Sequence, residues 1–380
     1  MQESAFANEV RRFTLYTKIF WPLHRRLVRN KITPRCTRCI VSANYAPLNG
    51  AGLCRYCRDG ISEFKKDQRD LKQMSAELHA LLDSYQGKGN GSHDALVLFS
   101  GGKDSCYLVD DLHSRYPGLR LLLITVDNTV MSPFALKNVA RVLKKLDFSH
   151  IQVRPPESLY TKMFRHAFLH LNEKGCSGTV DQFDGDFFHD VCRNWAVRLQ
   201  IPLVISGCSQ TQVERILGLS HFESPRWFEE SKRMEVANIR LTDVFTESEM
   251  AYWWDGTRWP KDKIPRVIYP FYAWNLAEDF IRAKVIGLEL LDADMNHPLL
   301  TNNQLIPLMT MVDMAKYGYS SFEPEFSQMV RDGKADPIFW RNVFELSEYA
   351  AKSGHFVAAS VDEMLERLDL TRQQLGLPVR

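Results

Sequence analysis

The chain has 380 residues, of which 45% are apolar and 25% are charged, and its net charge is +2. Because a typical domain has about 150 residues, this length predicts one large domain with an added module. The composition is that of a globular protein and excludes collagen-like, mucin-like and coiled-coil chains. Every apolar run is far shorter than the roughly 18 residues that cross a bilayer, and the N-terminus, MQESAFANEVRR, lacks the apolar stretch of a secretory signal. We therefore expect a cytoplasmic protein without a membrane span.

Residues 1–35 are predicted to form a basic arm. Residues 1 to 40 contain nine Arg or Lys residues against two acids, Glu3 and Glu9. Apolar and aromatic residues alternate with these cations in VRRFTLYTKIFWPLHRRLVRN, which is typical of an amphipathic helix. Such a helix caps its own domain or lies against a protein, a membrane or an RNA surface.

The next segment, 36–60, holds four of the eight cysteines in two CxxC pairs, which are Cys36, Cys39, Cys54 and Cys57. In a reducing compartment such a cluster more often binds metal than forms disulfides. Four thiolates satisfy one tetrahedral Zn²⁺ and leave no open position, so we predict a structural zinc ribbon. An iron–sulfur cluster and four unrelated buried cysteines are the alternatives.

Residues 61–92 are predicted to be a helix followed by a linker. Apolar residues recur at helical spacing over 62–85, and Gly87, Gly89 and Gly91 follow within a few residues. This glycine-rich stretch is the best candidate for a domain boundary.

A domain over 93–220 is predicted to be α/β. Short apolar runs at 95–99, 119–126, 151–155 and 202–206 alternate with helical stretches. This alternation favours a parallel sheet with crossover helices, whose strands are covered on both faces. The remainder, 221–380, begins with a tryptophan-rich insertion and continues as a mostly helical C-terminal region.

The loop after the first predicted strand is the most informative segment. Two glycines allow a tight turn, successive backbone N–H groups at a helix N-terminus form an anion-binding concavity, and a lysine adds a positive charge. Its adjacent glycines distinguish it from the Walker loop. The loop consists of Ser100, Gly101, Gly102, Lys103, Asp104 and Ser105.

The sequence SGGKDS resembles the PP-loop of the ATP pyrophosphatase superfamily, whose usual pattern is SGGxDS. The resemblance implies an adenine nucleotide α-hydrolase-like fold and cleavage of ATP between its α and β phosphates. AMP is then placed on a carbonyl oxygen, from which a nitrogen or sulfur nucleophile displaces it. The six loop residues would bind ATP and Mg²⁺, with Lys103 and Asp104 in catalytic roles. We expect Asp104 to orient the loop or to assist the metal.

Two further positions are placed by analogy with this family. Asp127, with Asn128 beside it, follows the second predicted strand, where ligands gather in open α/β sheets. Gly207 follows the strand at 202–206, where many relatives have a Gly-His motif, but the sequence here is Ser206-Gly207-Cys208-Ser209. We expect Asp127 and Gly207 to contribute to nucleotide binding.

A CxxC ribbon ahead of SGGKDS resembles the N-acetyl sugar amidotransferase branch of this superfamily, known from lipopolysaccharide and nonulosonic acid biosynthesis. The segments 269–274, 301–303, 317–319 and 329–333 also resemble that branch. The resemblance implies a small-molecule sugar acceptor and ammonia delivered by a glutaminase partner. The insertion at 222–265 does not fit the branch, so an acceptor other than a sugar stays open. A homodimer is the expected assembly.

Two other functions stay open. The first is a sulfurtransferase that thiolates tRNA or a small molecule, with a sulfur-donor protein as partner. Related enzymes use a persulfide or an iron–sulfur cluster, and Cys176 and Cys208 are the candidate catalytic thiols, although a buried free cysteine is more often inert. The second is a nucleic-acid-binding protein whose ribbon and basic arm contact phosphates without turnover. The acidic run at 181–186 has enough carboxylates for a metal site, but it is interpreted as a solvated turn.

Overall fold

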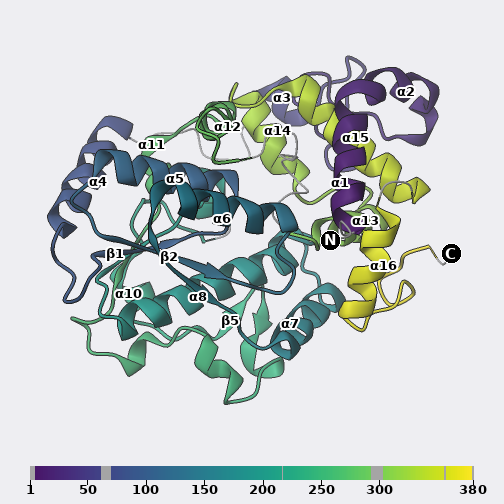
Figure 1. The fold of residues 1–380 in the computed structure, drawn as a ribbon. Coiled ribbons are helices and arrows are strands. Elements are labelled where there is room, and N and C mark those ends of the chain that lie inside the picture. Colours follow the sequence, from purple (N-terminus) through teal and green to yellow (C-terminus); the bar gives the residue numbers. More distant parts are fainter. Residues whose placement is uncertain (1–4, 61–69, 216, 292–302, 355–356, 379–380) are drawn as a thin grey trace.

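The computed structural model describes residues 5–60, 70–215, 217–291, 303–354 and 357–378. Its centre is a five-stranded parallel sheet in the order β3-β2-β1-β4-β7. Figure 1 shows helices on both faces of this sheet. The predicted α/β class with a four-cysteine module and a helical C-terminal region is confirmed. The strands are β1 (Ala95–Leu98), β2 (Leu121–Val126), β3 (Ser149–Val153), β4 (Leu203–Ile205) and β7 (Arg266–Ile268).

All residues of β1, β2 and β4 are buried, which is why these strands have continuous apolar sequences. The sequence did not predict β7, since it contributes only three residues, Arg-Val-Ile, and lies beyond the tryptophan-rich insertion. The chain runs from β1 outward to β2 and β3, and later from β4 outward to β7. The order therefore reverses between β1 and β4, and in open α/β sheets a crevice forms outside the carboxyl ends of the strands at such a point.

Helices cover the sheet in two layers (Figure 1). One layer holds α5 (Lys103–Arg115) and α6 (Pro133–Leu146), and the other holds α7 (Glu157–Leu169) and α8 (Gln182–Arg198). A helix was predicted over 62–85. The described part, α4 (Leu71–Tyr85), begins after Asp70, whose carboxylate accepts a hydrogen bond from the Gln73 backbone N–H, and 62–69 lie outside the described residues.

The tryptophan-rich insertion packs against α8 through short elements. They are α10 (Arg226–Glu229), the antiparallel pair β5 (Glu235–Val236) and β6 (Ile239–Arg240), and three short 3₁₀ turns, and α9 (Gln210–Arg215) precedes the insertion. Trp253 and Trp254 are buried, and Trp253 contacts the ring of Phe187 in α8. The indole of Trp254 donates to the Glu229 carbonyl at 2.8 Å.

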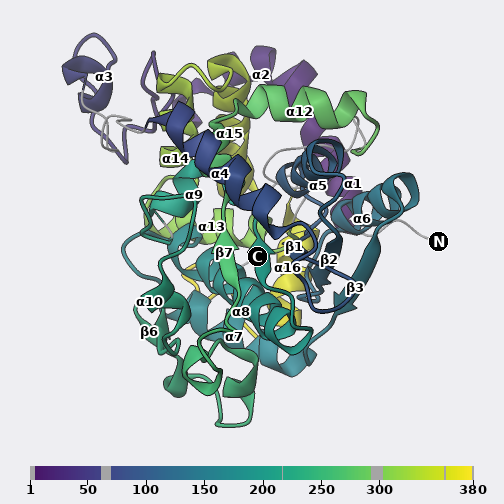
Figure 2. The same cartoon turned by 90° about the vertical axis from the view of Figure 1, so that its left-hand side faces the viewer.

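The C-terminal region is helical, and the N-terminal segment packs against it (Figure 2). The C-terminal helices are α11 (Pro270–Trp274), α12 (Glu278–Gly287), α13 (Ile306–Lys316), α14 (Glu323–Arg331), α15 (Pro337–Ser353) and α16 (Ala358–Arg367). The N-terminal segment consists of α1 (Ala5–Leu15), a π turn (Tyr16–Phe20), α2 (Trp21–Leu27) and a 3₁₀ turn (Arg29–Lys31).

Glu9 in α1 accepts hydrogen bonds from the backbone N–H groups of Ala359 and Ser360 at the start of α16. A carboxylate at a helix N-terminus is favoured by the partial positive charge there. These hydrogen bonds join α1 to α16. Among the described residues, no helix has the length and apolar character needed to cross a membrane.

Candidate nucleotide site

The SGGKDS loop connects β1 to α5 at the carboxyl edge of the sheet. Gly101 adopts a left-handed backbone with φ +74°, and a Cβ atom there would lie 2.2 Å from the carbonyl oxygen of Ala135 in α6. Only glycine fits this position, because both the conformation and the contact exclude a side chain. The Asn138 amide in α6 donates to the Gly101 carbonyl at 3.0 Å, which fixes the turn against its neighbouring helix.

The two serines of the loop hold its shape. The Ser105 hydroxyl donates to the Gly102 carbonyl at 3.1 Å and lies 3.3 Å from the Ser100 hydroxyl. The Ser100 oxygen accepts a hydrogen bond from the Gly102 backbone N–H at 3.4 Å. Gly102 is the N-cap of α5, so the first N–H groups of this helix open at the loop. This arrangement can receive an anion.

Lys103 and Asp104 extend from the loop toward open space. The Lys103 ammonium lies 2.7 Å and 2.9 Å from the two carboxylate oxygens of Asp104, and 3.8 Å from a carboxylate oxygen of Glu278 at the start of α12. Burial opposes ionisation of Glu278, but Lys103 and Arg282 outweigh it and hold the pKa of that carboxyl below its usual value. The lysine is thus held by two carboxylates that a bound phosphate could replace.

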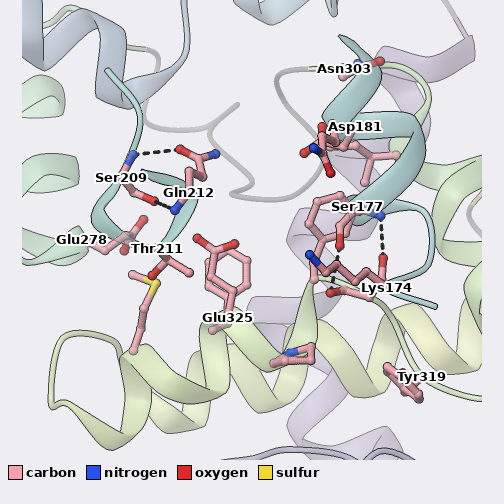
Figure 3. A pocket seen from close by; sticks show the side chains of 18 of the residues that line it. Lys174, Ser177, Asp181, Ser209, Thr211, Gln212, Glu278, Asn303, Tyr319 and Glu325 are labelled. Carbon is pink, nitrogen blue, oxygen red and sulfur yellow. Dashed lines mark hydrogen bonds between the residues drawn. The ribbon is translucent and has the colours of Figure 1, made fainter. Parts of the chain in front are cut away.

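These side chains line a pocket of about 340 Å³. Figure 3 shows this pocket from close by, with Glu278 among its labelled side chains. Its walls come from segments far apart in the sequence: the loop, the segment after β4, the start of α8, and α14. Tyr45 of the cysteine module also lines it. Sequence reasoning did not single out several of these residues, because only tertiary packing brings them to the loop; they are Tyr45, Lys174, Ser177, Thr211, Gln212, Glu278 and Glu325.

The acidic run at 181–186 is helical, so its interpretation as a solvated turn is wrong. A π turn (Ser177–Asp181) leads directly into α8. Asp184 accepts hydrogen bonds from the side-chain amides of Asn128 at 2.7 Å and Asn303 at 3.3 Å. Burial raises the pKa of Asp184 to about 6. Burial, with the nearby Asp184 and Glu325, raises the pKa of Asp181 to about 7.

Asp127 lies at the carboxyl end of β2, as the sequence predicts. Its carboxylate accepts a hydrogen bond from the Thr129 backbone N–H at 2.9 Å and lies 3.7 Å from the guanidinium of Arg154. Asp127 is not among the residues that line the pocket, whereas Asn303 is. The side-chain amides of Asn303 and Asn128 both donate hydrogen bonds to the Asp184 carboxylate. The role of Asp127 in nucleotide binding stays a prediction.

Gly207 lies against the loop, since a Cβ atom there would be 3.6 Å from the backbone carbonyl carbon of Asp104. Next to it, the Cys208 thiol is 3.7 Å from Nε2 of His189, and the same nitrogen is 2.9 Å from the Ser206 hydroxyl. Burial raises the pKa of Cys208 to about 12 and lowers the pKa of His189 to about 4. Both groups are therefore neutral near pH 7 in this conformation.

Cys176 is buried in front of α8 and directly precedes Ser177, which lines the pocket. Its backbone N–H donates to Asp313 in α13 at 2.9 Å, and burial raises the pKa of its thiol well above the ordinary value. Cys106 and Cys192 are also buried, with pKa values raised by burial. The structure places Cys208, but not Cys176, beside the loop. His297, Thr301 and Asn302 lie outside the described residues.

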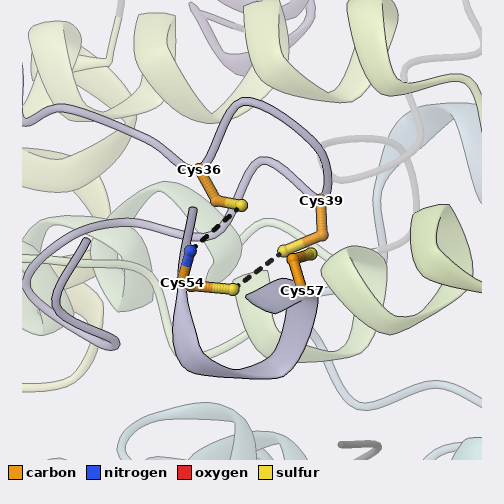
Figure 4. A group of neighbouring side chains, drawn as sticks. All are labelled: Cys36, Cys39, Cys54 and Cys57. Atoms are coloured by element: carbon orange, nitrogen blue, oxygen red, sulfur yellow. Dashed lines mark hydrogen bonds between the residues drawn. The ribbon is translucent and has the colours of Figure 1, made fainter. Parts of the chain in front are cut away.

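Cys36, Cys39, Cys54 and Cys57 are all buried, and their sulfur atoms lie within 4.8 Å of one another (Figure 4). Four Zn–S bonds of about 2.3 Å in a tetrahedron place the sulfurs about 3.8 Å apart, so the group fits one ion. A four-iron cluster would need a wider separation, because the metal atoms and sulfides lie between the cysteines. The hydrogen bond from Cys39 lowers the pKa of the Cys36 thiol.

The cysteine module, which includes α3 (Arg55–Asp59), is docked on the C-terminal helices. Arg35 is buried and forms ion pairs with Glu323 in α14 and Glu348 in α15. The Tyr45 ring contacts the Tyr319 ring with centroids 5.0 Å apart. This docking brings Tyr45 to the pocket, so the module supports one of its walls.

No protein family and no curated protein matches this sequence. Among solved structures, this chain is similar to the U34-tRNA thiolase NcsA from Methanococcus maripaludis with its 4Fe-4S cluster. The two are 14% identical, the match covers 90% of this chain and 91% of that chain, and the TM-score is 0.38. The NMN synthetase from Francisella tularensis is similar at 11% identity over 82% and 99% of the two chains, with a TM-score of 0.35. The NH3-dependent NAD synthetase from Campylobacter jejuni is similar at 13% identity over 75% and 97%, with a TM-score of 0.32.

Proposed function

We propose that this chain is an ATP-dependent enzyme of the PP-loop type that forms AMP and pyrophosphate. The observation that carries the proposal is the construction of the SGGKDS loop. It lies where the strand order reverses, it depends on a glycine that no other residue can replace, and it presents Lys103 and Asp104 to a pocket. Ligands of open α/β sheets bind in this position.

The residues present fit a nucleoside triphosphate. The N–H groups at the start of α5 would hold the departing pyrophosphate, and Lys103 would leave Asp104 and Glu278 to contact it. A bound Mg²⁺ would neutralise phosphate charge, and Asp104 is the carboxylate placed to hold it. A carbonyl oxygen of the acceptor attacks the α phosphorus, and the bond to pyrophosphate breaks. Ammonia then attacks the carbonyl carbon and AMP leaves with the oxygen.

For the acceptor we propose a sugar or a similar polyhydroxylated small molecule, as in lipopolysaccharide biosynthesis. The pocket offers hydroxyl and amide groups that donate and accept hydrogen bonds, which suits such a ligand. These groups are carried by Ser177, Gln182, Ser209, Thr211, Gln212, Asn303 and Tyr319. Ammonia would come from a glutaminase partner.

The test is the identity of the nucleotide product. Purified protein is incubated with ATP, Mg²⁺, ammonium chloride and a panel of N-acetyl sugars, and the products are separated by anion exchange. We expect AMP and pyrophosphate in equal amounts, dependent on the sugar. Formation of ADP and phosphate would contradict adenylation, and AMP that does not depend on any acceptor in the panel would contradict the proposed acceptor class.

A sulfurtransferase is the second candidate, because the structure places the Cys208 thiol beside His189 and next to the loop. The terminal sulfur of a persulfide on Cys208 would attack the activated carbon as AMP leaves, with His189 taking the proton. A thiol of the sulfur-donor protein would then attack the Cys208 sulfur, form a disulfide with it and release the thiolated acceptor. Cys208→Ala should abolish thiolation with a persulfide donor and leave ammonia-dependent amidation intact. Cys176→Ala should affect neither, because Cys176 is fully buried and lies against Asp313 in α13, not against the loop.

A further inference from the structure

The outer face of the N-terminal segment carries an exposed apolar patch. Five large side chains from the end of α1, the π turn and α2 have exposed fractions between 49% and 82%. Most large apolar side chains of the chain are buried, so this concentration in thirteen consecutive positions is unusual for one segment. We call these residues the N-terminal patch; they are Leu15, Ile19, Phe20, Leu23 and Leu27.

The opposite face of the same segment is anchored. Trp21 is fully buried, its indole donates to Glu345 in α15 at 3.2 Å, and its ring contacts Tyr349 at a centroid distance of 5.5 Å. Arg25 donates to Glu345 at 2.6 Å, and Phe13 is buried. The orientation of the segment is therefore set by its contacts with α15, and the N-terminal patch is held outward by the fold.

The segment that carries the patch is rich in positive charge. The sequence contains no Asp or Glu between Glu9 and Asp59, whereas this interval contains eleven Arg or Lys residues. Two of them are engaged by carboxylates of the C-terminal helices, Arg25 with Glu345 and Arg35 with Glu323 and Glu348. Several others are exposed in the same segment as the patch; they are Lys18, Arg26, Arg29 and Lys31.

We propose that this face binds the surface of an anionic lipid bilayer, with the apolar side chains at the boundary of headgroups and acyl chains. An interfacial helix needs an apolar face flanked by Lys and Arg, and both are present here. Anionic headgroups complement the cations. An RNA would satisfy the cations but would leave four aliphatic side chains without a partner, since RNA contacts use charge and aromatic stacking.

The place of the patch in the molecule allows such binding. In Figures 1 and 2, α2 lies at the margin of the protein beside α15, on the far side of the C-terminal helices from the sheet. A flat surface can approach this margin while the pocket at the edge of the sheet stays separate. The proposal is therefore independent of the reaction in the pocket.

The test is flotation of the full chain with vesicles of phosphatidylcholine alone or of phosphatidylcholine with phosphatidylglycerol. We expect binding to the vesicles with phosphatidylglycerol that is about ten-fold stronger than binding to the neutral vesicles and that falls with added salt. The double variant Leu23→Glu with Leu27→Glu should lose this binding by about ten-fold or more. Both side chains are exposed, so its melting temperature should match that of the unchanged chain.

The matched control is Trp227→Glu in α10, which removes a side chain that is 71% exposed in another part of the molecule and should leave flotation unchanged. Absence of flotation with anionic vesicles would overturn the proposal. Unchanged flotation of the double variant would also overturn it, because charge alone would then account for binding. Retention of tRNA on a filter by both the unchanged chain and the double variant, without flotation of either, would assign the face to RNA.

Discussion

Two clusters of opposite charges in this protein differ in how completely they are enclosed. At the loop, Lys103 faces Asp104 and Glu278, and the side chains of Lys103 and Asp104 are 20% and 37% exposed. On α8, Arg193 forms two hydrogen bonds with Glu229, at 2.6 Å and 3.0 Å, and both side chains are 1% exposed. The first cluster opens to a pocket and the second is covered by the tryptophan-rich insertion.

The enclosed cluster has its polar atoms occupied. Arg193 also donates to Asp190 at 3.1 Å, and Arg233 donates twice to Asp190, at 2.6 Å and 2.9 Å. Ser224 donates to Glu229 at 2.6 Å. Such a network fixes how the insertion sits on α8, because a buried charge that loses its partner is costly. The open cluster can exchange partners with a ligand, which is what a binding site requires.

Removal of metal should have the largest effect on stability. The four cysteine sulfurs are buried within 4.8 Å of one another, and structural zinc contributes on the order of 10 kcal/mol in small modules. We expect about one zinc per chain by mass spectrometry of the digested protein. Cys39→Ser should lose the metal and lower the melting temperature, whereas Cys106→Ala should keep the metal. Iron in place of zinc would contradict the proposed ion and favour sulfur chemistry.

Breaking the enclosed cluster should have the next largest effect. Glu229→Gln leaves the Arg193 charge buried without its main partner, so we expect a loss of about 3 to 5 kcal/mol in the free energy of unfolding. Urea unfolding followed by tryptophan fluorescence measures it. Glu230→Gln is the matched control, because the adjacent Glu230 pairs with the exposed Lys261 at the surface and should change little. Equal effects of the two variants would contradict the distinction between the clusters.

The sequence alone predicted the open cluster only in part, and the enclosed one not at all. The loop is readable because its glycines, charge and flanking strand and helix are contiguous between β1 and α5. Glu278 meets Lys103 across 175 positions of the chain, and Glu229 meets Arg193 across 36, with no periodic pattern to connect them. The β7 strand was not predicted for the same reason. Its three residues are too few to show a periodic pattern, and the strand forms by pairing with β4 in the sheet.

In the open cluster, a substitution should change chemistry and leave the fold unaffected. Asp104→Asn keeps the size of the side chain but removes the charge proposed to hold Mg²⁺, so we expect formation of AMP to fall about 100-fold or more. Because Asp104 is partly exposed, the melting temperature should stay the same. Asp110→Asn, later on the same helix, is the matched control for charge. Full activity in the Asp104 variant would remove the loop from the mechanism.

Gly101 follows β1 and Gly207 follows β4, and an alanine at each position tests how much space the turn leaves for a side chain. The expected effect is smaller than that of Asp104→Asn. Gly101→Ala places a methyl group against the Ala135 carbonyl in a left-handed conformation, so we expect a loss of more than about 1 kcal/mol in the free energy of unfolding. Gly207→Ala meets only ordinary contacts, with the ring of Phe271 at 3.5 Å, and should have little effect on stability. Denaturant unfolding of both variants checks the difference. An equal loss in both would show that the turn is not fixed as described.

The smallest effect concerns pH and Asp181, a carboxyl group that lines the pocket. Its pKa is raised from 3.8 to about 7 by burial. The folded protein therefore binds this proton more tightly than the unfolded chain, so stability is lost as the pH rises from about 4 through about 7 and is constant above that. Asp181→Asn should remove this loss and raise the melting temperature at about pH 8 but not at about pH 4. Asp181 is partly open to the pocket, and water reduces the effect. Asp369→Asn, at the surface, is the control and should not change how the melting temperature varies with pH. If the melting temperatures of the unchanged chain and of Asp181→Asn varied with pH in parallel, the Asp181 carboxyl would be ionised in the folded protein at all these pH values.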